Sequence, residues 1–176
     1  DVAPSRGLGD VYKRQLLIGC GSFFGLRISD LLTLTWSMLL DNEKFVITEQ
    51  KTGKRREIRV NCNFQKHIAD CYKSLGVVDK NEKCFLSRKR TVYSTQRINV
   101  LFKSMKSKYN LKIEHFSTHS MRKTFGRQVV EAAGENSEFA LIKLSELFNH
   151  ADIQTTRRYL GLRSQELLET YDMLNF

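Results

Sequence analysis

The chain has 176 residues, 41% hydrophobic and 27% charged, with a formal net charge of +10. This length allows one sizeable core and is too short to expect two. No apolar run approaches the roughly 18 residues that a membrane span needs. The positive charge favours a polyanionic partner, because each Lys or Arg placed on a phosphate releases counterions. A soluble protein that merely has many lysines has the same charge.

The first 14 residues, DVAPSRGLGDVYKR, show no apolar periodicity and no signal-peptide order. They are similar to translated sequencing-adapter sequence. We therefore expect a non-native or disordered leader over 1–14, a folded domain over 15–176, and a missing natural N-terminus. The four cysteines form no C-x-x-C pair, so we expect reduced core thiols in a cytosolic protein.

The first folded segments combine helix and strand signals. Residues 15–24 (QLLIGCGSFF) are apolar on most sides and predict a helix that ends at Gly25. Ser29 is expected to cap a short turn over 30–34. Two segments of strand composition follow, joined by a KTGK turn that suits a tight hairpin. The predicted strands are residues 44–50 and 56–61, and the turn glycine is Gly53.

Later segments predict a series of helices and one short extended piece at 84–87. Asn61 caps the first helix, which places Phe64, Ile68, Cys71 or Tyr72, and Leu75 on one face. The next helix opens at Ser94 or Thr95 and carries Ile98, Leu101, Phe102, Met105 and Tyr109. A third opens at Ser117 or Thr118, carries Met121, Phe125 and Val129, and is broken by Gly134-Glu135-Asn136.

Three further helices complete the prediction. They are residues 137–148, a helix that starts at Thr155 or Thr156 and carries Tyr159, and a final helix over 164–174. The apolar face of the final helix is formed by Leu167, Leu168, Tyr171 and Leu174. The expected fold class is mostly α with a small antiparallel β-sheet (α+β).

Two of the segments that carry candidate chemistry lie in the first half of the chain. Arg27 stands in the apolar stretch GLRISDLLTLTW, and a buried arginine is costly unless it is paired. The plain alternative is that Asp30, three residues on, simply pairs with it. KTGKRREIR (51–59) places two lysines at a hairpin tip, and its plain alternative is a solvated charged turn.

The other two segments lie in the second half. In THSMRKTFG, His119 and Arg122 are spaced i, i+3 and share a helix face. His115 and His119 are four residues apart, but no acidic or Cys partner has ligand spacing nearby, so no metal site is expected. In NHADIQTTRRYLG, His150 and Tyr159 are nine residues apart, and each taken singly is also a plausible packing residue.

Together these two Arg, two His, one Lys and one Tyr form a phosphoryl-transfer set that needs no metal. Arginine forks neutralise the non-bridging oxygens bidentately. Lys and His move protons, and a Tyr hydroxyl is the nucleophile. A free phenol has a pKa of about 10, so the tyrosine needs a base or a strongly positive site.

The segments resemble, in order, the motifs of the tyrosine recombinase (phage integrase) family. GLRISDLL resembles the first-arginine motif, and KTGKRREI resembles the lysine hairpin. HSMRKTF resembles the H-x-x-R box, and FNHADIQTTRRY resembles the H-x-x-I-x-x-T-x-x-Y box. A lone H-x-x-R motif does not indicate the family, because it arises by chance in many proteins. Four motifs in the family's order over residues 16–160 do indicate it.

The resemblance implies the catalytic-domain fold of that family and a role for each residue. Arg27 and Arg122 clamp the scissile phosphate, and Lys51 (with Lys54 as the fallback) protonates the leaving 5′ oxygen. His119 bonds the phosphate and accepts the tyrosine proton. His150 orients the phosphate, and Tyr159 forms a 3′-phosphotyrosine. The other tyrosines, Tyr12, Tyr72, Tyr93, Tyr109 and Tyr171, are weaker candidates.

The resemblance also implies the partners. No cofactor, ATP or metal is needed, and the substrate is double-stranded DNA. Family members usually carry an N-terminal core-binding domain, for which this chain has no room. We expect a homotetramer on DNA in which C-terminal tails are exchanged, although the final helix packing at home is an equal alternative. Expected DNA contacts are Lys54, Arg55, Arg56, Arg88, Lys89, Arg90, Arg97 and Lys103.

The leading interpretation is a site-specific DNA recombinase or integrase of a phage or mobile element. It would act in a prokaryotic cytoplasm, on the nucleoid, with no membrane association. A nicking-closing DNA topoisomerase shares the chemistry and is the first alternative. A DNA-binding module with truncated catalytic function is the second.

Overall fold

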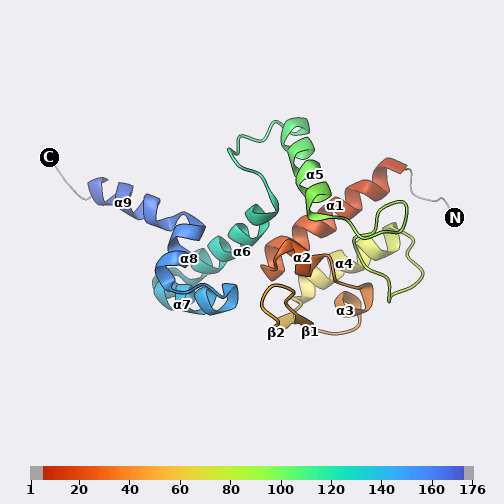
Figure 1. Cartoon of the computed structure of the whole chain (residues 1–176), viewed down its shortest axis with the longest axis horizontal. Helices are drawn as coiled ribbons and strands as arrows, with labels where there is room; N and C mark the ends of the chain where they lie inside the picture. Colours follow the sequence, from red (N-terminus) through yellow and green to blue (C-terminus); the bar gives the residue numbers. More distant parts are fainter. Residues whose placement is uncertain (1–5, 173–176) are drawn as a thin grey trace. The chain divides into compact units, whose positions relative to one another are not determined.

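The computed structural model describes residues 6–172 and, within them, the side chains of residues 9–162 and 168–172. The chain divides into two compact units, Asp1–Arg122 and Lys123–Phe176 (Figure 1). Each unit has its own cluster of buried apolar side chains, so the single core expected from the chain length is wrong. The mostly helical content with one two-stranded antiparallel sheet confirms the predicted fold class. Within residues 6–172, no helix combines the length and apolarity that crossing a bilayer requires.

Helix α1 (Arg6–Phe24) starts well before the expected residue 15. Residues 6–14, expected to form a leader, are helical here. Tyr12 packs against the core of the first unit, and Lys13 Nζ donates a 3.0 Å hydrogen bond to Leu86 O. Extending a helix costs far less than nucleating one, so the apolar stretch after residue 15 propagates helix into a segment that has no periodicity of its own.

Two short helices follow α1. Gly25 ends α1 with φ +58, a left-handed conformation that glycine adopts without strain. Helix α2 (Ile28–Leu31) has Arg27 as its N-cap, so the prediction that Ser29 caps this turn is wrong. The cause is the backbone, because Arg27 is extended (φ −67, ψ 151) and its carbonyl accepts the Leu31 N–H. Helix α3 (Trp36–Leu40), capped by Thr35, has no counterpart in the sequence prediction.

The predicted hairpin is confirmed. Strands β1 (Lys44–Thr48) and β2 (Arg55–Arg59) pair antiparallel, and Phe45 lies opposite Ile58. Gly53 has φ +67, as the tight turn requires. Burial alternates along β1, and continuing this alternation past the strand end turns Glu49 inward.

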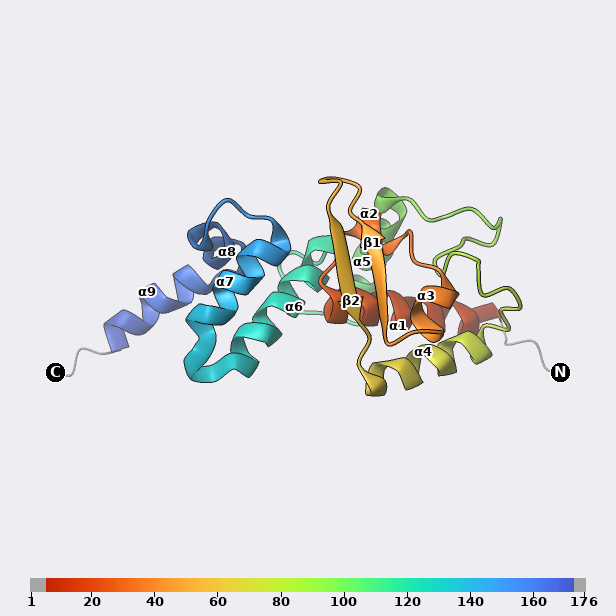
Figure 2. The ribbon, with the colours of Figure 1, turned by 90° about the horizontal axis from the view of Figure 1, so that it is seen from below.

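Helices α4 (Cys62–Ser74) and α5 (Thr95–Lys108) begin where their caps predicted. The Asn61 side chain accepts from two backbone N–H groups, and the Ser94 side chain accepts from one. Figures 1 and 2 show α4 beside α1, with α3 and the hairpin near them. The largest fully buried side chains of this core are Leu16, Leu31, Leu34, Trp36, Leu39, Ile68, Phe85, Ile98 and Phe102. Tyr109, expected on the apolar face of α5, is instead its exposed C-cap.

The cysteines are all unbridged. Cys20, Cys71 and Cys84 are buried, and Cys62 is exposed. Burial raises the pKa of the Cys71 thiol to about 11, with the charge of Asp70 adding to the effect. These buried thiols pack as small apolar groups and are chemically inert at neutral pH.

Helix α6 (Thr118–Ala133) starts in the first unit and continues into the second. It is followed by a 3₁₀ turn η1 (Gly134–Asn136), α7 (Ser137–Phe148) and α8 (Ile153–Leu160). Helix α8 begins two residues before the expected Thr155, because the Asp152 side chain caps it by accepting from Thr155 N. Leu141, Leu144, Phe148 and Leu160 form the buried cluster of this unit.

The last described helix, α9 (Leu162–Asp172), corresponds to the predicted 164–174. Leu168 is 68% exposed and Tyr171 is 74% exposed, so these two members of the predicted apolar face do not pack within the chain. Leu174 and the side chain of Leu167 lie outside the described residues.

Candidate active site

The two candidate phosphate-binding arginines are brought to one part of the first unit. Arg122 is 5% exposed, and its Nη1 donates a 2.7 Å hydrogen bond to the carbonyl of Gly25. Arg27, two residues after Gly25, is the N-cap of α2. The start of α6 therefore lies against the chain segment that carries Arg27, although 95 residues separate the two arginines in the sequence.

Glu49 is the carboxylate that pairs with Arg27. Arg27 Nη1 lies 2.8 Å from Glu49 Oε2, and the Glu49 side chain is 4% exposed. Asp30, which the sequence offered as the partner of Arg27, instead accepts the backbone N–H of Gln50 at 2.8 Å through Oδ1. Helix α2 is thus tied to the hairpin turn twice, by the ion pair of its N-cap Arg27 with Glu49 and by the hydrogen bond from Gln50 N–H to the Asp30 side chain.

Arg56 belongs to this internal group. Its Nη2 donates a 2.6 Å hydrogen bond to Phe24 O, and its Nη1 lies 3.7 Å from Glu49 Oε1. Its side chain is 13% exposed. Because its guanidinium binds an internal carbonyl and faces a buried carboxylate, Arg56 is poorly placed to contact a ligand. The predicted DNA contact therefore does not fit Arg56.

The pKa values of this group follow from burial and charge. Burial acts to raise the pKa of Glu49, but hydrogen bonds from Thr52 and Arg27, with the charges of Arg27 and Arg56, outweigh it and hold the pKa below its ordinary value. Burial lowers the pKa of Arg56, against the attraction of Glu49. Glu49 is therefore an anion at neutral pH.

Lys51 and His119 are the exposed members of the predicted set in the first unit. Lys51 lies in the hairpin turn, two residues after Glu49. His119 lies in the first turn of α6, three residues before Arg122 and hence on the same face of the helix. The first unit thus carries Arg27, Lys51, His119 and Arg122 on α2, the hairpin turn and the start of α6.

The second unit places His150 against Tyr159. Their ring centroids are 5.2 Å apart at an interplanar angle of 71°, an edge-to-face contact. His150 Nδ1 lies 2.9 Å from the hydroxyl of Thr156, which is fully buried. The Lys123 ammonium lies 5.5 Å from the centroid of the Tyr159 ring. The tyrosine is therefore near an imidazole and a cation within its own unit.

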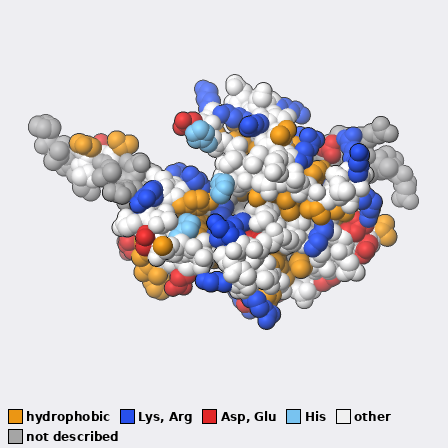
Figure 3. Space-filling view, in the orientation of Figure 1, with side chains coloured by type: hydrophobic (Ala, Val, Ile, Leu, Met, Phe, Trp, Pro, Cys, Tyr) orange, Lys and Arg blue, Asp and Glu red, His pale blue; other side chains and the backbone are white. Residues whose placement is uncertain are grey.

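The predicted DNA contacts other than Arg56 are exposed. Figure 3 shows Lys and Arg side chains spread over one face of the first unit. Two members form ion pairs, Arg88 with Asp10 at 2.9 Å and Arg90 with Glu82 at 2.6 Å. The remaining members are Lys54, Arg55, Lys89, Arg97 and Lys103.

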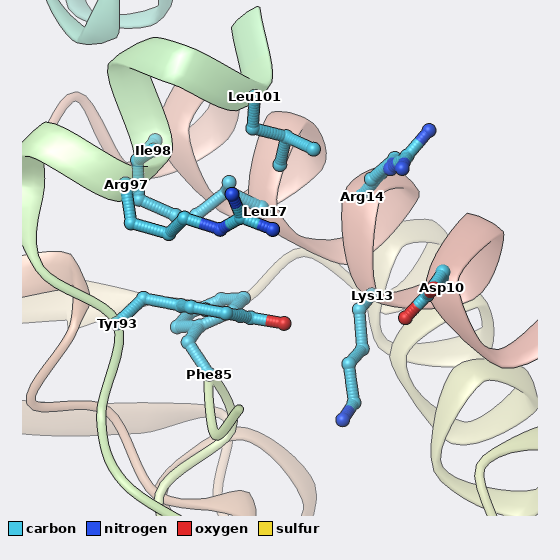
Figure 4. Close-up of a pocket in the computed structure, with 9 residues that line it drawn as sticks. All are labelled: Asp10, Lys13, Arg14, Leu17, Phe85, Tyr93, Arg97, Ile98 and Leu101. Carbon is cyan, nitrogen blue, oxygen red and sulfur yellow. The ribbon is translucent and has the colours of Figure 1, made fainter. Parts of the chain in front are cut away.

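Arg97 also lines a small pocket of about 60 Å³ between α1, α5 and the segment that joins α4 to α5. Figure 4 shows its guanidinium near the Tyr93 ring, with Lys13 and Asp10 across from it on α1. Burial, and then the charge of Asp10, raise the pKa of Tyr93. This pocket shares no lining residue with the group around Glu49.

Sequence reasoning missed Glu49 and Thr156. Strand alternation was the available signal for Glu49, because a carboxylate at an inward position needs a partner. No local signal marked Thr156, since a threonine near a helix start also reads as a cap. Among the residues that the structure describes, no group of three or more His, Cys, Asp or Glu side chains is arranged to hold a metal ion.

The architecture and these side chains define a class of protein: a mostly helical domain with one β-hairpin, two arginines brought together, and a tyrosine beside a histidine. The profile of the phage integrase family matches residues 14–166. The chain belongs to this family, and the resemblance drawn from its four motifs is confirmed.

Curated relatives have corresponding names. The chain is 29% identical over 137 residues to "Probable integrase/recombinase YoeC" of Bacillus subtilis (strain 168), covering 78% of this chain and 71% of that protein. It is 26% identical over 148 residues to "Tyrosine recombinase XerC" of Xanthomonas campestris pv. campestris (strain B100), covering 84% and 44%. The chain therefore spans less than half the length of that XerC protein.

Solved structures share the fold. XerA recombinase matches with a TM-score of 0.66 at 18% identity, covering 100% of this chain and 66% of that one. XerH site-specific recombinase, bound to its palindromic difH substrate in a post-cleavage complex, matches with a TM-score of 0.65 at 21% identity, covering 94% and 46%. At these identities the likeness establishes the fold.

Proposed function

We propose that this chain is the catalytic part of a site-specific DNA recombinase that cuts and rejoins DNA through a 3′-phosphotyrosine. The hydrogen bond from Arg122 to Gly25 O carries the proposal, because it brings two arginines from distant motifs together. Paired arginine forks match the non-bridging oxygens of a phosphodiester and stabilise the charge that develops on them in the transition state.

In the cleavage step, Tyr159 Oη attacks the phosphorus and the bond from phosphorus to O5′ breaks. The phenolic proton passes to His119, and Lys51 gives a proton to the leaving 5′ oxygen. Arg27, Arg122 and His150 hold the phosphate. A 5′ hydroxyl from another strand then reverses these steps. The phosphoester bond is conserved throughout, so the reaction needs neither ATP nor a metal.

Double-stranded DNA is the proposed partner. The XerH structure and the Tn1549 transposon integrase structures among the similar folds contain DNA. The net charge of +10 supports this proposal. The exposed predicted contacts support it as well, and they are Lys54, Arg55, Arg88, Lys89, Arg90, Arg97 and Lys103. Arg56 is omitted because it is bound internally. The proposed setting is a prokaryotic cytoplasm, with the gene carried by a phage or mobile element.

The salt dependence of DNA binding tests these contacts. Replacing Arg55, Lys89 and Lys103 by Gln should weaken binding to any sequence and lower the salt slope by about 1 per lost phosphate contact. Lys44→Gln, at an exposed position outside the proposed set, is the control. A salt slope that stays at the wild-type value in the triple variant would remove these residues from the interface.

We also propose that the chain works as a homotetramer on DNA and exchanges C-terminal tails between protomers. Support comes from α9, where Leu168 and Tyr171 are mostly exposed in the single chain. Exposed apolar side chains on a terminal helix are a common feature of partner-binding surfaces. Tail removal at residue 162 should leave DNA binding intact and abolish assembly on DNA, as measured by analytical ultracentrifugation.

Covalent trapping tests the chemistry. The probe is a pool of nicked duplexes with randomised sequence around the nick, so that the released fragment diffuses away and the adduct accumulates. The wild-type chain should give an SDS-resistant protein–DNA adduct, which is lost in Tyr159→Phe and kept in Tyr171→Phe. Sequencing the trapped DNA identifies the preferred duplex.

The other outcomes point to the competing functions. DNA binding without an adduct would overturn the proposal in favour of a binding module. Sequence-independent relaxation of a supercoiled plasmid, with no strand exchange, would favour a nicking-closing topoisomerase.

A further inference from the structure

Glu49 is the meeting point of the first unit's candidate catalytic elements. Its Oε2 accepts from Arg27 Nη1 at 2.8 Å and from the Thr52 hydroxyl at 2.8 Å. Its Oε1 faces Arg56 Nη1 at 3.7 Å. One buried carboxylate thus contacts the arginine at the start of α2 and a residue adjacent to Lys51.

The backbone of Glu49 holds the same turn. Glu49 N donates to Lys54 O at 2.9 Å, and Gly53 N donates to Glu49 O at 2.8 Å, so these bonds close the loop that contains Lys51. The neighbouring Gln50 N is held by Asp30 Oδ1. With its backbone and side chain both engaged, Glu49 cannot move without moving the Lys51 turn.

We propose that Glu49 is a positioning residue that sets Arg27 and the Lys51 turn in one fixed relation. This inference rests on the proposed function, in which Arg27 holds the phosphate and Lys51 protonates the leaving oxygen. A phosphate ligand and a general acid act on the same phosphorus centre, so their relative placement enters the rate directly. Glu49 does not touch DNA, because its side chain is 4% exposed.

The negative charge of Glu49 distinguishes a positioning role from a role in DNA binding. A carboxylate near a phosphate site repels the phosphate and cancels part of the charge of Arg27 and Arg56. Glu49 therefore works against DNA affinity, so its contacts serve something other than binding. Glu49→Gln should bind DNA as tightly as the wild type or more tightly, while it cleaves more slowly.

Two variants and a control separate the hold of Glu49 on Arg27 from its hold on the Lys51 turn. Glu49→Gln keeps the shape and removes the charge that holds Arg27. Thr52→Val removes the hydroxyl that ties the turn to Glu49 and leaves the ion pair with Arg27 in place. Glu57→Gln is the matched control, since Glu57 lies on the same hairpin and forms only an exposed pair with Lys44 at 3.6 Å.

The probe is the duplex recovered from the trapping pool, together with a twin that has sulfur in place of the bridging 5′ oxygen. A 5′ thiolate leaves without a general acid, so this twin is insensitive to a misplaced Lys51. Adduct formation on the ordinary duplex should fall by about tenfold to a hundredfold in Glu49→Gln and Thr52→Val and stay unchanged in Glu57→Gln. On the sulfur twin, Thr52→Val should recover fully and Glu49→Gln only in part.

A measurement without DNA follows Arg27 itself. In NMR spectra of the ¹⁵N-arginine-labelled chain, the Arg27 Nε–H should be ordered in wild type, Thr52→Val and Glu57→Gln and mobile in Glu49→Gln. Unchanged Arg27 order in Glu49→Gln, or equal loss of cleavage on both duplexes in Thr52→Val, would overturn the proposal. If the wild-type chain forms no adduct, the proposed function fails, and the NMR comparison still decides whether Glu49 holds Arg27.

Discussion

At the scale of single residues, the side chains that hold the candidate catalytic groups define the site as much as those groups do. Thr156 is fully buried, and its hydroxyl lies 2.9 Å from His150 Nδ1. A hydrogen-bond partner on one ring nitrogen restricts the rotation of an imidazole. Thr156 therefore sets how the His150 ring lies against Tyr159.

Replacing Thr156 by Val keeps the volume and removes this hydroxyl. We expect adduct formation to fall by about tenfold or more, because the imidazole loses its fixed orientation. Unfolding should become easier by about 1–3 kcal/mol, since a half-buried ring nitrogen loses its partner. Adduct assays and urea unfolding measure the two effects. Thr156→Ser should restore cleavage, and a Ser variant as slow as Val would show that the methyl group matters instead.

Glu49 predicts a specific loss of stability in acid. Its pKa in the folded chain lies below the ordinary value of 4.5. The unfolded chain therefore takes up the proton first, so the contribution of Glu49 is complete above pH 4.5 and is lost as the pH falls through the folded pKa. Urea unfolding at neutral pH and below pH 4 should show a larger drop in the wild type than in Glu49→Gln. Equal drops would show that other carboxylates account for the acid sensitivity.

At the scale of elements, local signals were sufficient for some boundaries and not for others. The caps Asn61 and Ser94 were readable because each bonds the first turn that follows it. The ion pair of Arg27 with Glu49 could not be predicted from the sequence, because Asp30 lies nearer in the sequence and carries the same charge. Only the folded hairpin brings Glu49, and not Asp30, to Arg27. The four motifs identified the candidate catalytic residues. Only tertiary contacts show which other residues hold their side chains in place.

Close packing of α1 against the start of α6 gives a prediction at this scale. A Cβ built on Gly21 lies 2.8 Å from Met121 Cβ, one residue before Arg122. Gly21→Ala should therefore destabilise the chain by about 1–3 kcal/mol through overpacking and displace the helix that carries Arg122. Thermal and urea unfolding test this. Gly9→Ala, with its nearest neighbour at 3.8 Å, should be neutral or stabilise by up to about 1 kcal/mol. A neutral Gly21→Ala would contradict the close approach.

At the scale of the whole molecule, the candidate residues are divided between two units. Arg27, Lys51, His119 and Arg122 belong to the first unit, and His150 and Tyr159 belong to the second. In the proposed cleavage step, both sets act on one phosphate. The tyrosine of one chain therefore joins either the arginines of the same chain or those of a neighbouring protomer.

Contacts within the second unit hold α8, and with it Tyr159, on the α6 segment of that unit. A Cβ on Gly126 of α6 would lie 2.5 Å from Leu160, the residue after Tyr159, so α8 is packed directly on α6. Lys123, which follows Arg122 on α6, has its ammonium 5.5 Å from the Tyr159 ring centroid. Detaching α8 from α6 would expose Leu160, which costs about 1.5–3 kcal/mol for a side chain of this size.

Mixing two defective chains on DNA distinguishes the arrangements. Lys51→Ala lacks the proposed acid and Tyr159→Phe lacks the nucleophile. Lys51 is exposed, and phenylalanine keeps the ring that packs against the cluster of the second unit. If each chain uses its own tyrosine, every site in the mixture keeps one defect, and adduct forms no faster than with Lys51→Ala alone. An equal mixture of wild type and Tyr159→Phe, which should give about half the wild-type adduct, calibrates the assay. If the tyrosine acts on a neighbour, about one pairing in four combines an intact Lys51 with an intact Tyr159. A Lys51→Ala and Tyr159→Phe mixture that reaches about half of this calibrated level would therefore mean that Tyr159 acts in a site completed by a neighbouring protomer.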